Sequence, residues 1–262
     1  MKRLITLFLC CFSFKLYSVE MSAQEYQAAV EDIQQILQSG NTRSLNLLSA
    51  ELEDDVLVVR PPNPRQGEIW LHWPVTNNAL RVLQVPHGSF DLHTREIGEL
   101  WFYSDANLIP RPDIIMFNTE HRYETEQSDL SRLASSLFTA AADAFSKMQR
   151  PISIVQIHGF NPARRKSDSG ASSDIILSNG SLYPDPGTVT RQSCLRDNGS
   201  LLARAYGRDV FELGATINPV GKLLRAQKEH QVSFLHIEMA FNLRKALLAQ
   251  AIPSEAIACL LD

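Results

Sequence analysis

The chain has 262 residues, 44% hydrophobic and 21% charged, which is enough apolar sequence for one sizeable core and excludes an intrinsically disordered protein. Its 25 basic and 29 acidic residues give a net charge of −4. These charges are spread without blocks of one sign, so nucleic acid is not an expected partner. We expect a single folded domain, because no repeat of about 20 to 50 residues is present.

Residues 1–18 have the layout of a secretory signal peptide. Two basic residues precede an apolar run over 4–14, which is shorter than the roughly 20 residues that a membrane span needs. We expect cleavage after residue 18, or as late as Ala23, with no stable membrane anchor afterwards. The remaining domain, residues 19–262, is therefore expected to be secreted or periplasmic.

Cys194 and Cys259 are the two cysteines of the expected mature chain. In an oxidising compartment, a disulfide between them would join the last helix to an inner segment. Two separate buried thiols fit the sequence equally well, because the Cα separation that a disulfide requires cannot be read from it.

The first part of the domain, residues 19–79, is predicted to form a helix followed by edge strands. A capping box at 22–25 precedes apolar residues at helical spacing, and this pattern stops at Gly40. Short apolar runs at 56–59 and 69–73 lie on either side of a proline-rich turn, which predicts antiparallel strands near a sheet edge.

From residue 80 onward, apolar runs of strand length alternate with amphipathic helical stretches. This alternation predicts an α/β fold with three α/β/α layers around a central mixed, mostly parallel sheet. In such folds, functional groups collect at the carboxyl ends of the strands. The predicted strands are residues 80–85, 114–117, 152–157 and 232–237, and the predicted helices are residues 128–149, 195–206 and 241–250.

Side chains that bind metals or move protons stand at the ends of three predicted strands. His87 and His158 each follow such a strand closely, and Glu238 follows the last one directly. Because side chains alternate along a strand, His236 lies on the same face as Glu238. Each of these residues has a structural explanation on its own, but three separate elements that end in such groups favour a shared site.

This set of residues is typical of a catalytic zinc site, in which three protein ligands leave one coordination position open. A further carboxylate then acts as the general base. We assign His87 and His158 as nitrogen ligands and Glu238 as the base. The residues leave three candidates for the third ligand, namely Asp91, His93 and Glu96.

Four segments occur in a suggestive order along the chain: VPHGSFDLHTREIGELWF, MFNTEHRY, VQIHGFNP and FLHIEMAFNLR. In this order and at these intervals they resemble the zinc-dependent N-formylglutamate amidohydrolases. That family is related to the zinc carboxypeptidases and to the succinylglutamate desuccinylase and aspartoacylase group. The resemblance extends over about residues 80–250.

The resemblance implies an α/β/α fold of the zinc-peptidase and phosphorylase/hydrolase kind, one zinc ion, and hydrolysis of an amide bond next to a carboxylate. By motif position, it places His87 and His158 on the metal, Asp91 at the third ligand position, and Glu238 in catalysis. One departure is that residues 93–96 resemble the histidine-x-x-glutamate zinc motif of carboxypeptidases, which would displace His87 and Asp91. We favour His87 because it directly terminates a strand.

Arg122 follows another predicted strand, and its planar guanidinium suits the carboxylate of a substrate. A salt bridge with Glu124 or Glu126 is the alternative. The basic loop that follows His158, residues 161–173, is predicted to be a mobile entry for an anionic substrate or an ordinary solvated loop.

Further on, Asp174 and Asn179 flank the next apolar run and are candidates to orient a ligand histidine. Nothing in their spacing establishes this role.

The sequence therefore predicts an exported, zinc-dependent hydrolase for a small anionic or peptide substrate, such as an N-acyl amino acid or a peptidoglycan fragment. A non-catalytic zinc- or ligand-binding protein of the same fold is the alternative. A serine hydrolase with Ser89 or Ser178 as nucleophile is the weakest reading, because no glycine-x-serine-x-glycine elbow is present.

Overall fold

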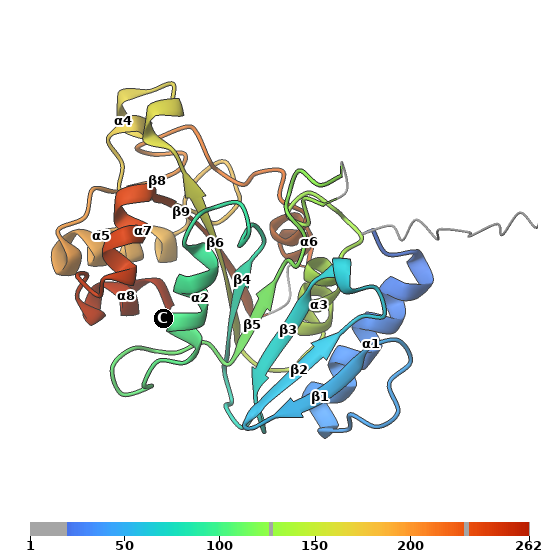
Figure 1. Ribbon diagram of the computed structural model, residues 1–262. Coiled ribbons are helices and arrows are strands. Elements are labelled where there is room, and N and C mark those ends of the chain that lie inside the picture. The colour runs from blue at the N-terminus through green and yellow to red at the C-terminus, as the bar shows by residue number, and fades with distance from the viewer. Residues whose placement is uncertain (1–19, 126–127, 228–230, 262) are drawn as a thin grey trace, which may run out of the picture.

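The computed structural model describes residues 20–125, 128–227 and 231–261 (Figure 1). The predicted signal peptide, residues 1–18, lies outside the described residues. The described residues form a nine-stranded sheet in the order β1-β2-β3-β5-β4-β6-β9-β7-β8.

The bounds of the elements are as follows. The strands are β1 (Ser49–Glu53), β2 (Val56–Arg60), β3 (Glu68–His72), β4 (Leu80–Val85), β5 (Ile114–Phe117), β6 (Ile152–Phe160), β7 (Ile175–Ser178), β8 (Ala203–Ala205) and β9 (Val232–Ala240). The α-helices are α1 (Ala23–Ser39), α2 (Thr94–Phe102), α3 (Leu137–Ser146), α4 (Asp168–Ala171), α5 (Pro186–Gly199), α6 (Pro219–Ala226), α7 (Phe241–Leu248) and α8 (Ser254–Leu261). Two 3-10 turns are η1 (Pro64–Gln66) and η2 (Pro162–Arg164).

The centre of the sheet is parallel, and antiparallel pairings join its outer strands to this centre. β4 pairs in parallel with β5 and β6, and β6 pairs in parallel with β9. β3 runs antiparallel to β5 on one side, and β7 runs antiparallel to β9 on the other. The sheet is mixed as predicted, and its parallel strands direct their carboxyl ends to one edge.

Helices cover both faces of the sheet, and a hydrophobic core lies under each layer (Figure 1). α1, α3 and α6 pack on one face, and α2, α5, α7 and α8 pack on the other. The alternating side chains of β4 divide between the two cores, with Leu80 and Val82 in the first and Leu83 and Val85 in the second. The predicted three-layer arrangement is present.

The predicted N-terminal elements are confirmed. The side chain of Ser22 accepts a hydrogen bond from the backbone N–H of Glu25 at 3.2 Å, and the Glu25 carboxylate accepts one from the N–H of Ser22 at 2.8 Å. α1 ends at Gly40, whose left-handed φ of 65° suits glycine. β1 was not predicted, because its residues are mostly exposed and its sequence lacks the alternation of apolar and polar residues that indicates a strand.

Two of the predicted helices differ from the structure. The helix expected over 128–149 is confined to α3, because Ser136 caps its start through the N–H of Thr139 at 3.3 Å and the residues before it form turns. The stretch 195–206 is not one helix. α5 ends where Ser200 takes a left-handed conformation, and the chain then pairs as β8 with the edge of β7.

Cys194 in α5 and Cys259 in α8 form a disulfide with a Cα–Cα distance of 5.8 Å. The bonded alternative is therefore the one that the structure adopts. The bond connects two helices of the same face that are 65 residues apart in the chain.

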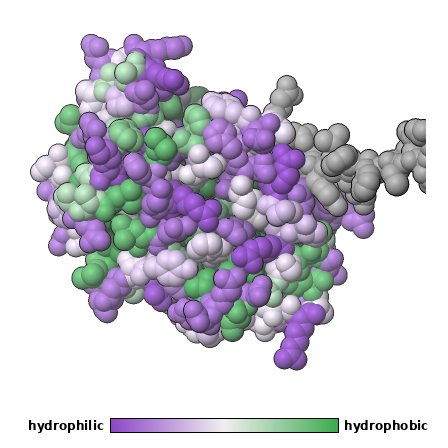
Figure 2. Space-filling view, viewed as in Figure 1, coloured by the Kyte–Doolittle hydropathy of each residue, from purple (hydrophilic) through white to green (hydrophobic). Residues whose placement is uncertain are grey.

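The face of the molecule seen in Figure 2 has hydrophilic and hydrophobic residues interspersed. Within the described part of the chain, no helix has both the length and the apolar character of a membrane span.

Candidate metal centre

Three parallel strands place their terminal polar residues at one edge of the sheet. His87 lies two residues beyond β4, His158 lies near the end of β6, and Glu238 lies near the end of β9. In the β6–β9 ladder, His158 is the register partner of Glu238, so both side chains point to the same side. The convergence expected from the sequence is present.

A single tight turn brings Asp91 beside His87. The N–H of Asp91 donates to the carbonyl of His87 at 2.7 Å, which closes one helical turn and places the two side chains on one face. Thr94 then donates its hydroxyl to the carbonyl of Asp91 at 2.7 Å, where α2 begins. The four-residue spacing of histidine and aspartate therefore has a direct geometric consequence.

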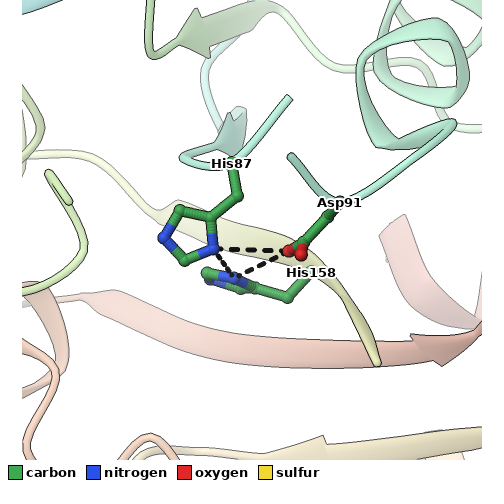
Figure 3. Close-up of side chains that lie close together, drawn as sticks. All are labelled: His87, Asp91 and His158. Carbon is green, nitrogen blue, oxygen red and sulfur yellow. Dashed lines mark hydrogen bonds and ion pairs between the residues drawn. The ribbon is translucent and has the colours of Figure 1, made fainter. Parts of the chain in front are cut away.

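Three ligand atoms converge in a triangle of the size that a metal ion requires (Figure 3). The Nδ1 atoms of His87 and His158 are 2.9 Å apart, and Oδ2 of Asp91 lies 3.3 Å from the first and 3.5 Å from the second. A tetrahedral ion with bonds of about 2.0–2.1 Å separates its ligand atoms by about 3.3 Å. These residues are the one group of three such side chains that meets this proximity among the described residues.

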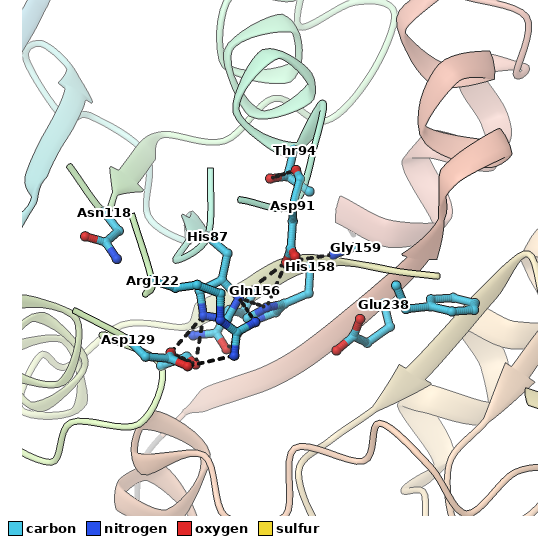
Figure 4. Close-up of polar contacts among 12 residues, drawn as sticks. His87, Asp91, Thr94, Asn118, Arg122, Asp129, Gln156, His158, Gly159 and Glu238 are labelled. Carbon is cyan, nitrogen blue, oxygen red and sulfur yellow. Dashed lines mark hydrogen bonds and ion pairs between the residues drawn. The ribbon is translucent and has the colours of Figure 1, made fainter. Parts of the chain in front are cut away.

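The far side of each imidazole is held by a hydrogen-bond acceptor (Figure 4). Nε2 of His87 lies 2.8 Å from Oδ1 of Asp129, and Nε2 of His158 lies 3.1 Å from Oε1 of Gln156. A neutral imidazole that donates from Nε2 keeps a lone pair on Nδ1. Both lone pairs are thereby available where the rings converge, which is the orientation that ligand histidines need.

Gln156 belongs to a buried chain of amide groups under the site. Its Nε2 donates to Oε1 of Gln84 at 3.0 Å, and Gln84 in turn donates to the carbonyl of Phe138 at 3.5 Å. The side-chain amide of Asn218 also donates to Oε1 of Gln156 at 2.6 Å. Since the Nε2 atom of Gln156 is already engaged, its Oε1 is the atom that His158 faces, and the amide orientation is determined by the network.

Burial and neighbouring charges set the protonation of the three residues. Burial lowers the pKa of His158 to about 4, and the charge of His87 acts in the same direction. Burial also lowers the pKa of His87, but hydrogen bonds with Asp129 and Asp91 outweigh it, so the pKa of His87 lies above its ordinary value. Burial raises the pKa of Asp91, yet hydrogen bonds from both histidines hold it well below the usual range. At neutral pH His158 is neutral and Asp91 is anionic, as metal ligands must be.

Glu238 lines the same cavity as the three converging residues, a space of about 590 Å³. Figure 4 shows its carboxylate directed toward the His87, Asp91 and His158 cluster. Nε2 of His236 lies 3.3 Å from Oε1 of Glu238, and the rings of His236 and His158 are 4.6 Å apart. His236 and Glu238 thus share one face of β9, as the alternation predicted.

The other candidates for the third ligand lie elsewhere. His93 has a left-handed φ of 76° at the start of α2, and its ring stacks on Phe241 at a centroid distance of 5.6 Å. Glu96 is exposed on α2. Of the three candidates, only Asp91 reaches the two histidines.

Arg122 forms an ion pair, but with a partner that the sequence did not suggest. Its Nη2 donates to Oδ2 of Asp129 at 2.8 Å, whereas Glu124 is not its partner and Glu126 lies outside the described residues. Nη1 lies 3.2 Å from Nδ1 of His87, and the guanidinium stands over the ring of Phe90 at 5.2 Å. Arg122 therefore lines the cavity beside the cluster.

Several other residues singled out from the sequence have structural roles. Asp174 accepts a hydrogen bond from the N–H of Leu202, and Asn179 accepts one from the N–H of Ser181, so neither orients a ligand histidine. The loop that follows His158 is built from η2 and α4, and the carboxylate of Glu212 accepts N–H groups from residues 166 and 167.

Neither serine proposed as a nucleophile is activated by histidine. The hydroxyl of Ser89 donates to the carbonyl of Glu120 at 3.1 Å. The hydroxyl of Ser178 donates to the carbonyl of Gly214 at 2.6 Å. Within the described residues, neither hydroxyl bonds to an imidazole, so the arrangement that a serine hydrolase needs is not formed.

The sequence did not single out Asp129, Gln156 or Asn218. Asp129 falls in a stretch that resembled a helix, and Gln156 is a polar residue within an apolar strand. The one available signal was Gln156 itself, because a strand residue two positions before His158 shares its face and an amide buried there needs a partner.

No family model and no curated protein matches the chain. Solved structures similar to it include N-formylglutamate amidohydrolase from Ralstonia eutropha JMP134, with 13% identity, a TM-score of 0.42, and coverage of 73% of this chain and 96% of that one. A candidate metallopeptidase from Shewanella denitrificans OS217 has 10% identity, a TM-score of 0.40, and coverage of 90% and 89%. A candidate carboxypeptidase A from the same organism has 11% identity, a TM-score of 0.41, and coverage of 90% and 67%. These similarities are too low to carry an argument about function, which rests on the site.

Proposed function

We propose that this protein is a metal-dependent hydrolase that cleaves an amide bond next to a carboxylate. The observation that carries the proposal is the triangle formed by Nδ1 of His87, Nδ1 of His158 and Oδ2 of Asp91. A carboxylate suited to general base catalysis, Glu238, lines the same cavity.

Zinc is the ion that we propose for the site. Two imidazole nitrogens and one carboxylate oxygen form a donor set that zinc uses in catalytic sites, where three protein ligands leave a position open. The hydrogen bonds of Asp129 and Gln156 to the outer nitrogens favour the same assignment, because ligand histidines are ordinarily held in this way.

A bound zinc ion would supply Lewis acidity and lower the pKa of a coordinated water to about 7. Glu238 is proposed to accept a proton from the attacking water as its oxygen bonds to the amide carbon. It then delivers this proton to the leaving nitrogen as the C–N bond breaks. The hydrogen bond from His236 to Glu238 keeps the carboxylate oriented for both transfers.

Export to the periplasm or the exterior is part of the proposal. Residues 1–18 suggest it, and the disulfide between Cys194 and Cys259 supports it, because such bonds persist in oxidising compartments. Peptides, peptidoglycan fragments or N-acyl amino acids would then be the accessible substrates. Nucleic acid is not among the proposed partners.

The test combines metal analysis with activity. We expect the purified protein to contain about one zinc ion per chain, to hydrolyse members of a panel of N-acyl amino acids and short peptides, and to lose activity on chelation. Glu238→Gln is expected to retain the metal and to lose turnover by at least about 100-fold.

Two results would contradict the proposal in different ways. Full activity in Glu238→Gln would remove this residue from the mechanism. A bound metal with no hydrolysis across the panel would favour the non-catalytic binding protein.

A further inference from the structure

Arg244 is a buried cation without a carboxylate partner. It lies in the first turn of α7, just after β9, and is only 5% exposed. Among the described residues, no carboxylate oxygen forms an ion pair with its guanidinium within 4.0 Å. A buried charge is costly unless it is paired, so this arrangement calls for an explanation.

The protein satisfies only part of the hydrogen-bonding capacity of Arg244. Nη1 donates to the carbonyl of Leu92, and Nη2 donates to the carbonyl of Phe160 at 3.5 Å. Nε is buried and has no hydrogen-bond partner in the part of the chain that the structure describes. A guanidinium has five N–H donors, so these two bonds to neutral carbonyls leave three donors unused.

The chain makes room for the guanidinium next to the cluster. A side chain at Gly159 would overlap the guanidinium, and Gly159 directly follows His158. Arg244 lines the same cavity as Glu238 and Asp91, and the charges of these two residues act on it. The side chain of Arg244 therefore adjoins the space that a substrate of the proposed enzyme would enter.

The charges around the cluster show what would complete the site. Counting only side chains that are at least largely buried, Asp91, Asp129 and Glu238 supply three negative charges, while Arg122 and Arg244 supply two positive ones. Arg132 also pairs with Asp129, but its side chain is 70% exposed and its charge is screened by water. With neutral imidazoles the group has a net charge of −1, and a divalent ion changes this to +1. A ligand with one negative charge would neutralise the loaded site.

The other arginines of the cavity are less suited to hold that anion. Arg122 is bonded to Asp129 at 2.8 Å, and Arg165 has Glu212 within 3.8 Å. Arg164 and Arg132 are exposed, and water weakens their attraction for an anion. Arg122 and Arg165 also have a buried Nε without a hydrogen-bond partner, but each is paired with a carboxylate. Among the described arginines of the cavity, Arg244 alone combines burial with the lack of a carboxylate partner.

We propose that Arg244 is the specificity-determining residue of the site and binds the carboxylate adjacent to the scissile amide bond. This inference rests on the proposed function. It assigns Arg244, in place of the Arg122 expected from the sequence, as the carboxylate anchor, that is, the residue that binds the substrate carboxylate. The planar fork of a guanidinium donates two parallel hydrogen bonds to a carboxylate.

The experiment measures binding rather than turnover. The zinc-loaded Glu238→Gln variant is titrated by calorimetry with N-acetyl-L-alanine and N-acetyl-L-phenylalanine, and with the carboxamide of each. We expect at least one carboxylate to bind about 10- to 100-fold more tightly than its carboxamide, as a charge-assisted bidentate contact provides. In the double variant that also carries Arg244→Gln, this preference is expected to fall below about 3-fold.

Matched variants separate the anchor from general charge and from folding. Arg164→Gln removes an equal charge from the rim and is expected to keep the preference. Gly159→Ala retains the charges of Arg164 and Arg244 but places a methyl group against the Arg244 guanidinium. It is therefore expected to reduce the preference for the carboxylate, and it tests the proposal even if Arg244→Gln fails to fold. Zinc content and circular dichroism check that each variant is intact.

Two results would overturn the anchor: no preference for either carboxylate in the Glu238→Gln background, or a full preference in the Arg244→Gln or Gly159→Ala variant. Failure of the hydrolase proposal is distinguishable, because it would show as carboxylate preference without turnover by the wild-type protein. That result would support the anchor while removing the enzyme.

Discussion

Asp129→Asn tests whether the charge-assisted hydrogen bond behind His87 strengthens metal binding at the proposed site. Oδ1 of Asp129 lies 2.8 Å from Nε2 of His87, and Oδ2 accepts from Arg122 at 2.8 Å. Burial raises the pKa of Asp129, but the hydrogen bond and charge of His87 hold it well below its ordinary value, so the residue is anionic at neutral pH. Asparagine keeps the shape of the side chain while it removes this charge.

The expected magnitude follows from the role of such outer hydrogen bonds. Substitution of these outer partners commonly reduces metal affinity by about 10- to 100-fold, or about 1.4 to 2.7 kcal/mol. We expect a loss in this range because the Asp129 bond to His87 is short and almost fully buried. The bond between Asp129 and Arg122 is lost at the same time, so a small decrease in unfolding free energy is expected as well.

The assay is a competitive zinc titration against a chromophoric chelator, with urea unfolding of the metal-free protein as a folding check. Arg132→Gln is the matched control, because Nε of Arg132 lies 3.5 Å from Oδ2 of Asp129 and its side chain is 70% exposed. We expect the control to bind zinc as the wild type does. A zinc affinity of Asp129→Asn within about 3-fold of wild type would refute the reasoning, as would an equal loss in the control.

Three further predictions follow from other parts of the structure. Gln156→Leu removes the hydrogen-bond partner of His158, Gln84 and Asn218. We expect the unfolding free energy to fall by about 1 to 3 kcal/mol and zinc binding to weaken. Wild-type values in urea and zinc titrations would contradict this. Below the raised pKa of His87, zinc binding should release about one proton from His87 and none from His158, whose pKa is about 4. The zinc affinity should therefore rise about 10-fold per pH unit until the pH passes the pKa of His87. Calorimetry in buffers of different ionisation enthalpy counts the released protons, and a second proton would contradict this assignment. Replacing Cys194 and Cys259 by alanine opens a loop of 65 residues. In the chain-entropy view this lowers the unfolding free energy by up to roughly 4 kcal/mol. Unchanged urea unfolding would show that the bond does not stabilise the fold.

Local pattern was sufficient for the elements that carry the central residues. The apolar runs that became β4, β6 and β9 are recognisable in the sequence, and so are the polar residues at their ends. His87, His158 and Glu238 could be predicted to converge because parallel strands bring their carboxyl ends to the same edge. The position of Asp91 beside His87 could also be predicted, because the two residues are four positions apart and one helical turn of the chain brings them together.

Longer stretches that lack a clear apolar run of strand length were predicted less well. Residues 128–136 have helical character in isolation, but in the structure they form turns that present Asp129 to His87, which is 42 residues away in the chain. The stretch 195–206 similarly yields to pairing between β8 and β7. In both cases a tertiary contact outweighed a weak local propensity.

The sequence by itself determined the layered α/β fold and the identity of the polar residues at one sheet edge, because both depend on periodicity and on short spacings. Only the tertiary structure decided which groups surround those residues. The acceptors behind the histidines, the formation of the disulfide, and the uncompensated charge of Arg244 all involve contacts between segments far apart in the chain. Such contacts leave no periodic trace in the sequence, since they depend on how the elements pack rather than on how each one forms.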